Sequence, residues 1–321
     1  MRAWLNETPG QMRLGEVDTP EPGPGEVRVR VETVGINRAD LVQVKGNYPP
    51  PPGFDPRMPG LEYAGTIDAV GARVLGRKVG EPVMGLIGGG AYAEYVTIHE
   101  AETIPVPAGL DMAAAGGVPE VFLTAYRAMY LIGGLQPGQS CLIRPASAGV
   151  GLAAVQLAAA LGSRPLGTSR DLARLAEAEA LGLAGSIVDN DDMAARVREL
   201  TGDAGAAVVV DMIGGNLTQS LAALRDEGTL VLLGLLAGRE SPVALGDVLR
   251  RRLSLRGMTM RSLPLDGRIQ MARLFSDRLT PLFEAGRLKA FIAAEYPFED
   301  AERAHADMAA GRFSGKLVLR M

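Results

Sequence analysis

The sequence predicts an α/β protein in which a β-rich first third precedes a doubly wound parallel sheet. Valine alternates with charged residues over residues 26–34, which is typical of a half-buried strand. Glycine and proline separate further short β-like runs at residues 65–70, 82–86 and 92–98, as in a small barrel. After Asp111, strand-like and helix-like segments alternate, and this order implies right-handed crossovers between parallel strands.

The middle and the tail of the chain are assigned from their apolar patterns. Residues 112–129 are rich in alanine and favour a helix. The expected strands then cover residues 140–144, 163–167, 206–211 and 229–234, and the expected helices cover residues 150–161, 172–181 and 216–224. In the tail we expect amphipathic helices at residues 268–285 and 301–310 and a closing strand at residues 316–321. The acidic run from Asp189 to Asp192 is expected to form a solvated loop.

Composition excludes several classes of function. The 321 residues carry a formal net charge of −4, so no basic excess is present to hold a nucleic acid. No long apolar run follows the N-terminus, so we expect no signal peptide, no membrane partner and a cytoplasmic location. Cys141 is the single cysteine, and with only His99 and His305 beside it a thiolate- or imidazole-rich metal site is not expected.

A small-residue loop joins the first strand of the alternating part to its helix. A strict G-x-G-x-x-G pattern would place glycine at Ala146, Ala148 and Gly151, and only Gly151 matches. Such a loop, with Gly149 and Val150 opening the helix, lets backbone N–H groups approach a pyrophosphate. A tight turn with small residues for packing explains the loop equally well. The strand–helix–strand context favours the dinucleotide site.

The end of the second strand indicates which dinucleotide would bind. An NAD site usually places an acidic residue about twenty residues after the loop, where it bonds the ribose hydroxyl groups. This strand instead ends at Ser169 and Arg170, with Arg174 one helical turn later. A hydroxyl and two guanidinium groups suit a 2′-phosphate. We therefore expect NADPH as cofactor, although Asp171 lies close by and weighs against it.

Seven segments carry a family resemblance through their shared order and spacing. With them, nearly the full chain resembles the medium-chain dehydrogenases/reductases, and most of all the p53-inducible branch of the zinc-independent quinone oxidoreductases. The segments are residues 35–41 (GINRADL), 46–53 (GNYPPPPG), 59–65 (PGLEYAG), 119–126 (PEVFLTAY), 146–151 (ASAGVG), 211–215 (DMIGG) and 315–319 (GKLVL).

The resemblance implies a domain organisation and an assembly. It predicts a GroES-like β-barrel catalytic domain over residues 1–117 and 264–321. An inserted Rossmann domain with a doubly wound parallel sheet would cover residues 118–263. Members of the family form homodimers by joining Rossmann sheets edge to edge, and residues 252–259 are the expected edge here.

The same resemblance argues against a catalytic zinc. The zinc enzymes of the superfamily hold their metal with a cysteine and a histidine, and the matching positions here are Asn37 and Leu61. Glu62 remains, but one carboxylate does not make a metal site. Without a Lewis acid the substrate has to be electrophilic by itself, as quinones and α,β-unsaturated carbonyls are.

The resemblance also names residues for the substrate pocket. Asn37 would face the nicotinamide and donate a hydrogen bond to the acceptor oxygen, although an asparagine that caps a turn is common. Tyr48 would line the pocket, or donate a proton as the matching tyrosine is proposed to do in enoyl thioester reductases. Arg261 falls in a stretch that lies near the site in the family, and a surface arginine is the alternative.

Further cofactor contacts follow from the same source. Thr124 matches a position beside the nicotinamide, although a threonine within a helix often bonds only its own backbone. Gly234 and Leu235 follow the fourth strand, where contacts to the carboxamide are expected.

The C-terminal cofactor contact of the family would correspond to Ser314, Gly315 and Lys316, although a hairpin turn accounts for the glycine equally well. One departure concerns Asp189, which stands where the family often has a tyrosine near the adenosine. An acid there is expected to weaken phosphate binding.

Three functions fit the sequence. The first is an NADPH-dependent quinone reductase that needs no metal. The second is an enoyl reductase acting on 2-alkenals or enoyl thioesters, which differs in pocket shape and in its need for a proton donor. The third is a non-catalytic NADPH-binding sensor or structural protein, for which the altered loop glycines leave room.

Overall fold

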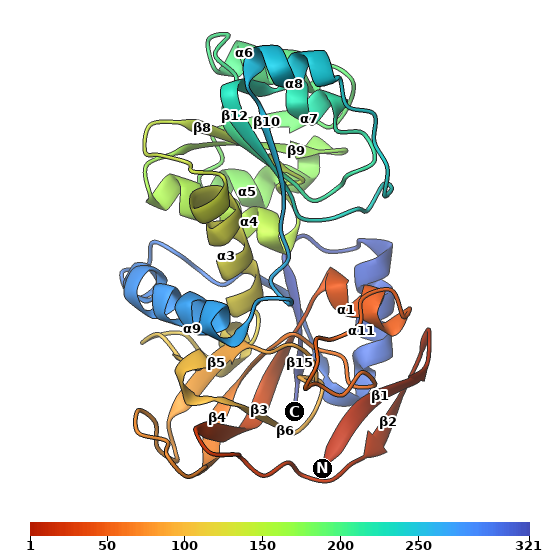
Figure 1. The fold of residues 1–321 in the computed structure, drawn as a ribbon, viewed down its shortest axis with the longest axis vertical. Helices are drawn as coiled ribbons and strands as arrows, with labels where there is room; N and C mark the ends of the chain where they lie inside the picture. The colour runs from red at the N-terminus through yellow and green to blue at the C-terminus, as the bar shows by residue number, and fades with distance from the viewer. The chain divides into compact units, whose positions relative to one another are not determined.

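The computed structural model describes residues 1–321, and the chain divides into two compact units (Figure 1). The first unit comprises residues 1–120 together with residues 260–321, and the second comprises residues 121–259. The family resemblance predicts domain limits at 117/118 and 263/264, and these limits stay a prediction. No helix is long and apolar enough to cross a membrane.

A seven-stranded mixed sheet forms the first unit. Along the sheet the strands follow the order β14-β15-β3-β4-β5-β7, and β6 pairs with β3. The pairing has free ends at β14 and β7, so the expected barrel is not closed. The strands are β3 (Glu26–Ile36), β4 (Glu62–Val70), β5 (Pro82–Leu86), β6 (Tyr95–His99), β7 (Ile104–Pro105), β14 (Ile292–Pro297) and β15 (Lys316–Arg320), and β1 (Arg2–Thr8) and β2 (Gln11–Glu16) form a separate hairpin.

The alternating valines of β3 explain its place in the core. Val27, Val29 and Val31 are buried, whereas Arg28 and Arg30 between them point to the other face. β3 is antiparallel to β4 on one side and to β15 on the other, with Leu317 opposite Ile36. The C-terminal strand therefore brings its first residue to the end of β3. The helices of this unit are α1 (Arg38–Val44), α2 (Met112–Ala115), α9 (Leu265–Leu274), α10 (Thr280–Glu284) and α11 (Ala301–Ala310).

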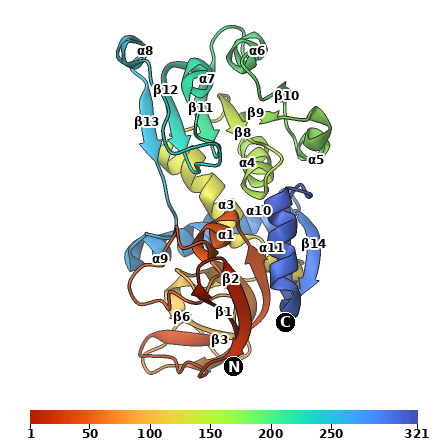
Figure 2. The ribbon, with the colours of Figure 1, turned by 90° about the vertical axis from the view of Figure 1, so that its right-hand side faces the viewer.

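A six-stranded parallel sheet forms the second unit, in the order β10-β9-β8-β11-β12-β13 (Figure 2). The chain starts in the middle of this sheet, runs to the β10 edge, and then returns past β8 to the other half. Helices α4 and α5 cover one face and α6 and α7 the other (Figure 2). The strands are β8 (Ser140–Arg144), β9 (Arg164–Ser169), β10 (Gly185–Val188), β11 (Ala206–Asp211), β12 (Leu224–Leu232) and β13 (Ser254–Gly257), and the helices are α4 (Gly149–Ala160), α5 (Ala176–Ala180), α6 (Met193–Leu200), α7 (Thr218–Ala222) and α8 (Leu245–Arg251). Helix α3 (Pro119–Tyr126) begins with the last two residues of the first unit and continues in the second.

This strand order matters for binding because it reverses between β8 and β11. In open parallel sheets, ligands bind beyond the carboxyl ends of the strands on either side of such a reversal. The last residues of these two strands are Arg144 and Asp211, which lie directly opposite each other in the register. The loops that follow these two strands are therefore where we expect a ligand of this sheet.

Several expected elements differ from the observed ones. The expected helix over residues 112–129 is divided between α2 and α3, because Gly116, Gly117 and Pro119 interrupt it. The expected helix over residues 268–285 is a run of α9, a π-helical segment and α10. Strand β10 and helix α6 were not expected, and β12 begins five residues earlier than the predicted strand.

Candidate active site

The loop after β8 has the geometry of an anion site. Helix α4 begins at Gly149, and no side chain caps it. The first N–H groups of a helix lack an intrahelical acceptor, and they attract negative charge together with the helix dipole. Gly151 lets the helix start close to the loop, because a Cβ there would lie 2.3 Å from the carbonyl oxygen of Pro145. These residues fit a dinucleotide diphosphate.

Next to this loop, β9 ends at Ser169, which is buried. The Ser169 hydroxyl accepts a hydrogen bond from the backbone N–H of Asp171 at 3.3 Å. The Asp171 carboxylate in turn accepts from the N–H of Ala173 at 3.0 Å and caps a short helix. The acidic side chain that weighed against NADPH thus has a local structural role, and Arg170 beside it is exposed.

Arg144 forms a buried ion-pair network at the carboxyl end of β8. Its Nη2 donates to Asp189 Oδ1 at 2.8 Å, and its Nε lies 3.1 and 3.0 Å from the two oxygens of the same carboxylate. Its Nη1 donates to Asp211 Oδ2 at 3.2 Å and to Ser220 Oγ at 3.1 Å. Burial acts to lower the pKa of the Arg144 guanidinium, but the two carboxylates outweigh it and the pKa is raised.

This network corrects the expectation of a solvated loop at Asp189, whereas Asp191 and Asp192 of the same acidic run are exposed as expected. The Asp189 side chain is only 7% exposed. Its backbone N–H donates to the carbonyl oxygen of Ser169 at 2.9 Å, so Asp189 lies directly beside the end of β9. The acid therefore lies beside Ser169 at the end of β9, and it is paired with an arginine.

In the first unit, Asn37, Glu62 and Lys316 form a second buried cluster. The Lys316 ammonium lies 2.5 Å from Glu62 Oε1 and donates to Asn37 Oδ1. Asn37 Nδ2 donates to the same Glu62 oxygen at 3.0 Å. The other Glu62 oxygen accepts from the backbone N–H of Glu120 at 2.8 Å. Gly35 makes room for this carboxylate, since a Cβ there would lie 2.2 Å from Glu62 Oε1.

An ammonium group thus sits between the two side chains that remain at the metal-ligand positions. Leu61, which the resemblance matches to the histidine ligand of the zinc enzymes, is apolar and buried. No group of three or more His, Cys, Asp or Glu side chains is arranged to hold a metal ion. A divalent cation here would have to displace the ammonium and would find one carboxylate and one amide oxygen, a donor set that does not fit zinc.

A chain of hydrogen bonds continues from Asn37 into the core. The Asn37 N–H donates to Asp40 Oδ2 at 2.7 Å, and the hydroxyl of Tyr92 lies 3.2 Å from the same oxygen. The Tyr92 hydroxyl also lies 2.9 Å from His305 Nε2. Burial raises the pKa of Asp40 to about 7, opposed by the hydrogen bond from Asn37 and by Lys316. Burial also lowers the pKa of His305 to about 4, so this histidine is a neutral packing residue at physiological pH.

We expect Asp40→Asn to change how stability depends on pH. The Asp40 carboxyl binds its proton more tightly in the folded protein, with a pKa of about 7 against 3.8, so its stabilising contribution is complete below pH 3.8 and is lost as pH rises to about 7. The free energy of unfolding of the wild type should therefore fall relative to the variant between pH 4 and 7, by at most about 1.4 kcal/mol per pH unit. His305 contributes the opposite slope, and both proteins share it.

Urea unfolding at several pH values measures this difference. His305→Asn is the matched control, since it leaves the Asp40 contribution in place. A constant difference between wild type and Asp40→Asn across the range would show that Asp40 ionises normally.

Arg261 and Tyr48 are also brought together. Arg261 is buried rather than exposed, and its guanidinium donates to Gly88 O and Tyr48 O at 2.6 Å and to Gln43 Oε1 at 2.8 Å. The guanidinium carbon lies 4.9 Å from the centre of the Tyr48 ring. Burial raises the pKa of the Tyr48 phenol, Glu120 acts in the same direction, and Arg261 opposes them. Tyr48 is therefore held in place and stays protonated at neutral pH.

The other residues that we expect to contact the cofactor lie after β12, within α3 and at the start of β15. Gly234 and Leu235 follow β12, at the same sheet edge as the loop after β8. Thr124 is buried within α3. Ser314 and Gly315 precede β15, and the side chain of Lys316, which follows them, is directed to Asn37 and Glu62.

The site residues predicted from the sequence do not include Arg144, Asp211, Asp40 or Tyr92. A signal existed for the first two, because each is the last residue of a parallel strand, and such residues meet at one edge. No sequence pattern connects Asp40 to Tyr92.

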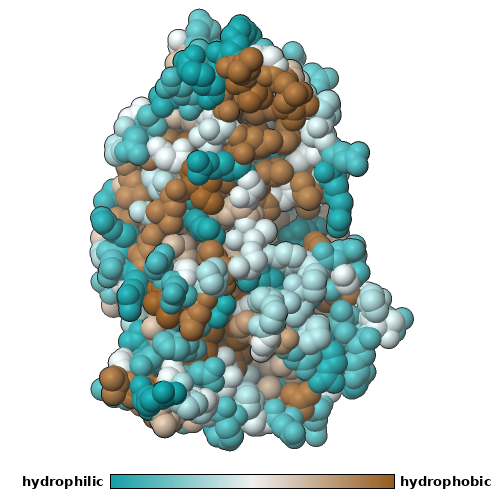
Figure 3. Space-filling view, viewed as in Figure 1, coloured by the Kyte–Doolittle hydropathy of each residue, from teal (hydrophilic) through white to brown (hydrophobic).

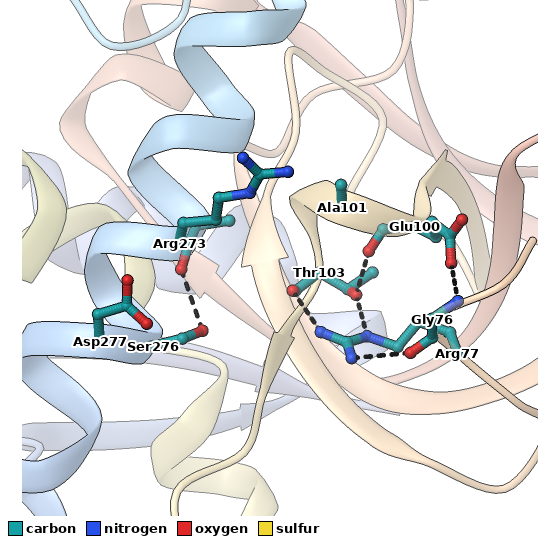
Figure 4. Close-up of a pocket in the computed structure, with 9 residues that line it drawn as sticks. Gly76, Arg77, Glu100, Ala101, Thr103, Arg273, Ser276 and Asp277 are labelled. Atoms are coloured by element: carbon teal, nitrogen blue, oxygen red, sulfur yellow. Dashed lines mark hydrogen bonds between the residues drawn. The ribbon is translucent and has the colours of Figure 1, made fainter.

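A shallow hollow of about 280 Å³ also lies in the first unit (Figure 4). Arg77 in its wall donates to the hydroxyl and the carbonyl oxygen of Thr103 at 2.7 and 3.0 Å. The Glu100 carboxylate accepts hydrogen bonds from the backbone N–H groups of Leu75 and Gly76, and Figure 4 draws the bond from Gly76. These polar side chains form hydrogen bonds within and between the loops that line the hollow. None of the predicted site residues lines it.

Comparisons with known proteins identify the family. Residues 23–108 match the alcohol dehydrogenase GroES-like domain, and residues 149–277 match the zinc-binding dehydrogenase model. The quinone oxidoreductase of Pseudomonas aeruginosa is 35% identical over 309 residues, which cover 93% of this chain and 92% of that protein. This chain belongs to the medium-chain dehydrogenase/reductase family, in its quinone oxidoreductase-like group.

Solved structures of this family agree with the fold. The quinone oxidoreductase of Pseudomonas syringae pv. tomato matches with a TM-score of 0.90 and 29% identity, covering 100% of this chain and 99% of that one. The Escherichia coli quinone oxidoreductase complexed with NADPH matches with a TM-score of 0.88 and 27% identity, with the same coverage. The predicted combination of a GroES-like domain and a Rossmann sheet is confirmed, and the protein is an oxidoreductase of this family.

Proposed function

We propose that this protein transfers a hydride from NADPH to a quinone without a metal ion. The observation that carries the proposal is the Lys316 ammonium, which contacts both Asn37 and Glu62, the polar side chains at the positions that the family resemblance matches to the metal site of the zinc enzymes. An acceptor in such a site gains no Lewis acid, so it has to stabilise the added electrons itself. The quinone oxidoreductase names of relatives across the whole chain support the same substrate class.

In this proposal the second unit binds the cofactor, which supplies the hydride. The free N–H groups at the start of α4 hold the diphosphate, and the residues around Ala146, Ala148 and Gly151 let it approach. Ser169, Arg170 and Arg174 face the 2′-phosphate with a hydroxyl and two positive charges.

The first unit supplies the polar groups for the acceptor. Lys316 and Glu62 fix the orientation of the Asn37 amide, whose second N–H has only a 3.5 Å contact with Gly35 O and remains able to bond an acceptor oxygen. Arg261 holds Tyr48 through its backbone oxygen and its ring. Positioning of this kind supplies much of the rate in a hydride transfer.

An enoyl reductase is the second candidate, and the environment of Tyr48 favours it. Its phenol stays protonated because burial raises its pKa, so a proton donor is available for the carbon that becomes carbanion-like in an enal. Quinone reduction has no such need, since hydroquinone oxygens take protons from water.

We expect Tyr48→Phe to separate the two candidates. If the enzyme is a quinone reductase, the variant should keep quinone turnover within about threefold, whereas loss of a general acid costs about 10²- to 10⁴-fold in enal reduction. Loss of NADPH absorbance with a panel of quinones and 2-alkenals measures both rates. Tyr95→Phe is the matched control, because Tyr95 also lies against an arginine, Arg28, but in β6.

Three results would contradict the proposal. The first is enal reduction that far exceeds quinone reduction in the wild type and collapses in Tyr48→Phe. The second is tight NADPH binding with no turnover of any acceptor, which points to the non-catalytic alternative. The third is a rate that falls on treatment with a chelator and returns with zinc, which contradicts the absence of a metal.

We also propose a homodimer through the edge of the Rossmann sheet. β13 is an edge strand, and Leu255 on it is 47% exposed. Leu245 and Leu249 on the neighbouring α8 are 75% and 81% exposed, and Figure 3 shows hydrophobic side chains gathered over this part of the unit. Exposed apolar side chains beside an open strand edge favour association with a second copy. Analytical ultracentrifugation of the wild type tests this.

A further inference from the structure

The Arg144 network lies where the cofactor's adenosine half is expected to bind. Val188 of β10 pairs with Ser169 of β9, and Asp189 follows it directly. Asp189 is therefore adjacent in the sheet to Ser169, the residue whose hydroxyl we assign to the 2′-phosphate. A carboxylate at this edge has two possible effects, since it repels a phosphate and it accepts hydrogen bonds from ribose hydroxyl groups.

The two acids of the network differ in how much they depend on Arg144. Asp211 accepts from the N–H groups of Ile213 and Gly214 at 2.8 and 3.0 Å and from Ser220 Oγ at 2.6 Å. The Asp189 carboxylate has Arg144 as its one partner and contacts it with both oxygens. Loss of the guanidinium would leave Asp211 with three donors and Asp189 with none.

The Arg144 guanidinium fixes the position of the Asp189 carboxylate. Arg144 uses all three of its nitrogens, because Nε and Nη2 hold Asp189 and Nη1 holds Asp211, Ser220 and the carbonyl oxygen of Asn216. A planar guanidinium that contacts both oxygens of a carboxylate fixes its direction as well as its charge. Such a pair turns the carboxylate toward β8 and away from bulk solvent.

We propose that Arg144 is a positioning residue for cofactor choice, which holds Asp189 in a two-point ion pair so that no free carboxylate meets the 2′-phosphate of NADPH at the ends of β9 and β10. This rests on the proposed preference for NADPH. In this proposal the Arg144–Asp189 ion pair lets the protein bind a phosphorylated cofactor although an acidic residue lies beside the 2′-phosphate site. Removing Arg144 frees the acid to repel that phosphate and to bond the ribose of NADH.

Dissociation constants for NADPH and NADH test this, each measured by nucleotide fluorescence without any acceptor. We expect Arg144→Met to lower the ratio Kd(NADH)/Kd(NADPH) about tenfold or more, because an unpaired charge then faces the phosphate at short range. Asp189→Asn alone should keep or raise the ratio. The double variant Arg144→Met with Asp189→Asn should restore it to within about threefold of the wild type, since the disturbing charge is gone.

The restored ratio is the result that a purely structural role of Arg144 does not produce, because both variants lack the same guanidinium. Equal ratios in Arg144→Met and in the double variant would overturn the proposal. Should Arg144→Met not fold, Arg144→Lys with and without Asp189→Asn gives the same comparison, since lysine keeps the charge but not the two-point contact. A wild type that binds NADH as tightly as NADPH contradicts the proposed function instead, so the two failures are distinguishable.

Discussion

Lys316→Met should lower the free energy of unfolding by about 3–5 kcal/mol, the amount typical of a buried ion pair that loses one partner. Lys316 and Glu62 are both almost completely buried, and the Glu62 oxygen that contacts the ammonium has only the Asn37 amide as a second donor. Methionine fills a similar volume without charge, so the loss comes from the uncompensated carboxylate rather than from a cavity.

Urea unfolding, monitored by tryptophan fluorescence, measures this loss of stability in the first unit. Trp4 is the single tryptophan, is buried in the first unit, and reports on the unit that contains the pair. Lys78→Met is the matched control, since Lys78 is exposed and the change should cost less than about 0.5 kcal/mol.

The double variant Lys316→Met with Glu62→Gln separates the ion pair from general packing. Because the lone charge is then absent, the double variant should be clearly more stable than the sum of the two single changes predicts. If Lys316→Met unfolds at the same urea concentration as the wild type, the buried pair does not stabilise this site.

The elements with strong periodicity could be predicted from the sequence. The valine alternation of β3 and the strand–loop–helix at residues 140–161 are both present, because they depend on local pattern and on small residues at a tight turn. β10 was not predictable in this way. It has four residues, and Ile187 is the only one of them that is buried, so neither its length nor its pattern distinguishes it from a loop.

Because β10 was not predicted, the environment of Asp189 was not predicted either. Without β10 the acidic run could only be read as solvated, although the carboxylate lies beside β8 at 45 residues' separation. The contact between Lys316 and Asn37 spans 279 residues and depends on β15 pairing with β3. The sequence indicated a closing strand, but local pattern carries no information on which strand is its neighbour.

The turn from β8 into α4, in contrast, was predicted from its strand–helix context and its small residues, and Gly151 in this turn supports the largest effect we expect on cofactor binding. Gly151→Ala should weaken NADPH binding by about 5- to 150-fold. The added Cβ would lie 2.3 Å from Pro145 O and 2.7 Å from the carbonyl carbon and oxygen of Ala146, all of them backbone atoms that cannot rotate away. Relief of such overpacking typically costs about 1–3 kcal/mol, and it has to come from moving the loop away from the start of α4.

Fluorescence titration of NADPH and of NADH measures the effect, and both affinities should fall together because both cofactors carry the diphosphate. This common loss distinguishes Gly151→Ala from Arg144→Met, which should act on the ratio of the two. Gly246→Ala is the control, since Gly246 lies in α8 of the same unit with no atom within 4 Å of its Cβ position. If Gly151→Ala folds and binds both dinucleotides as the wild type does, the diphosphate does not rest on this loop, and the cofactor site has to be sought elsewhere.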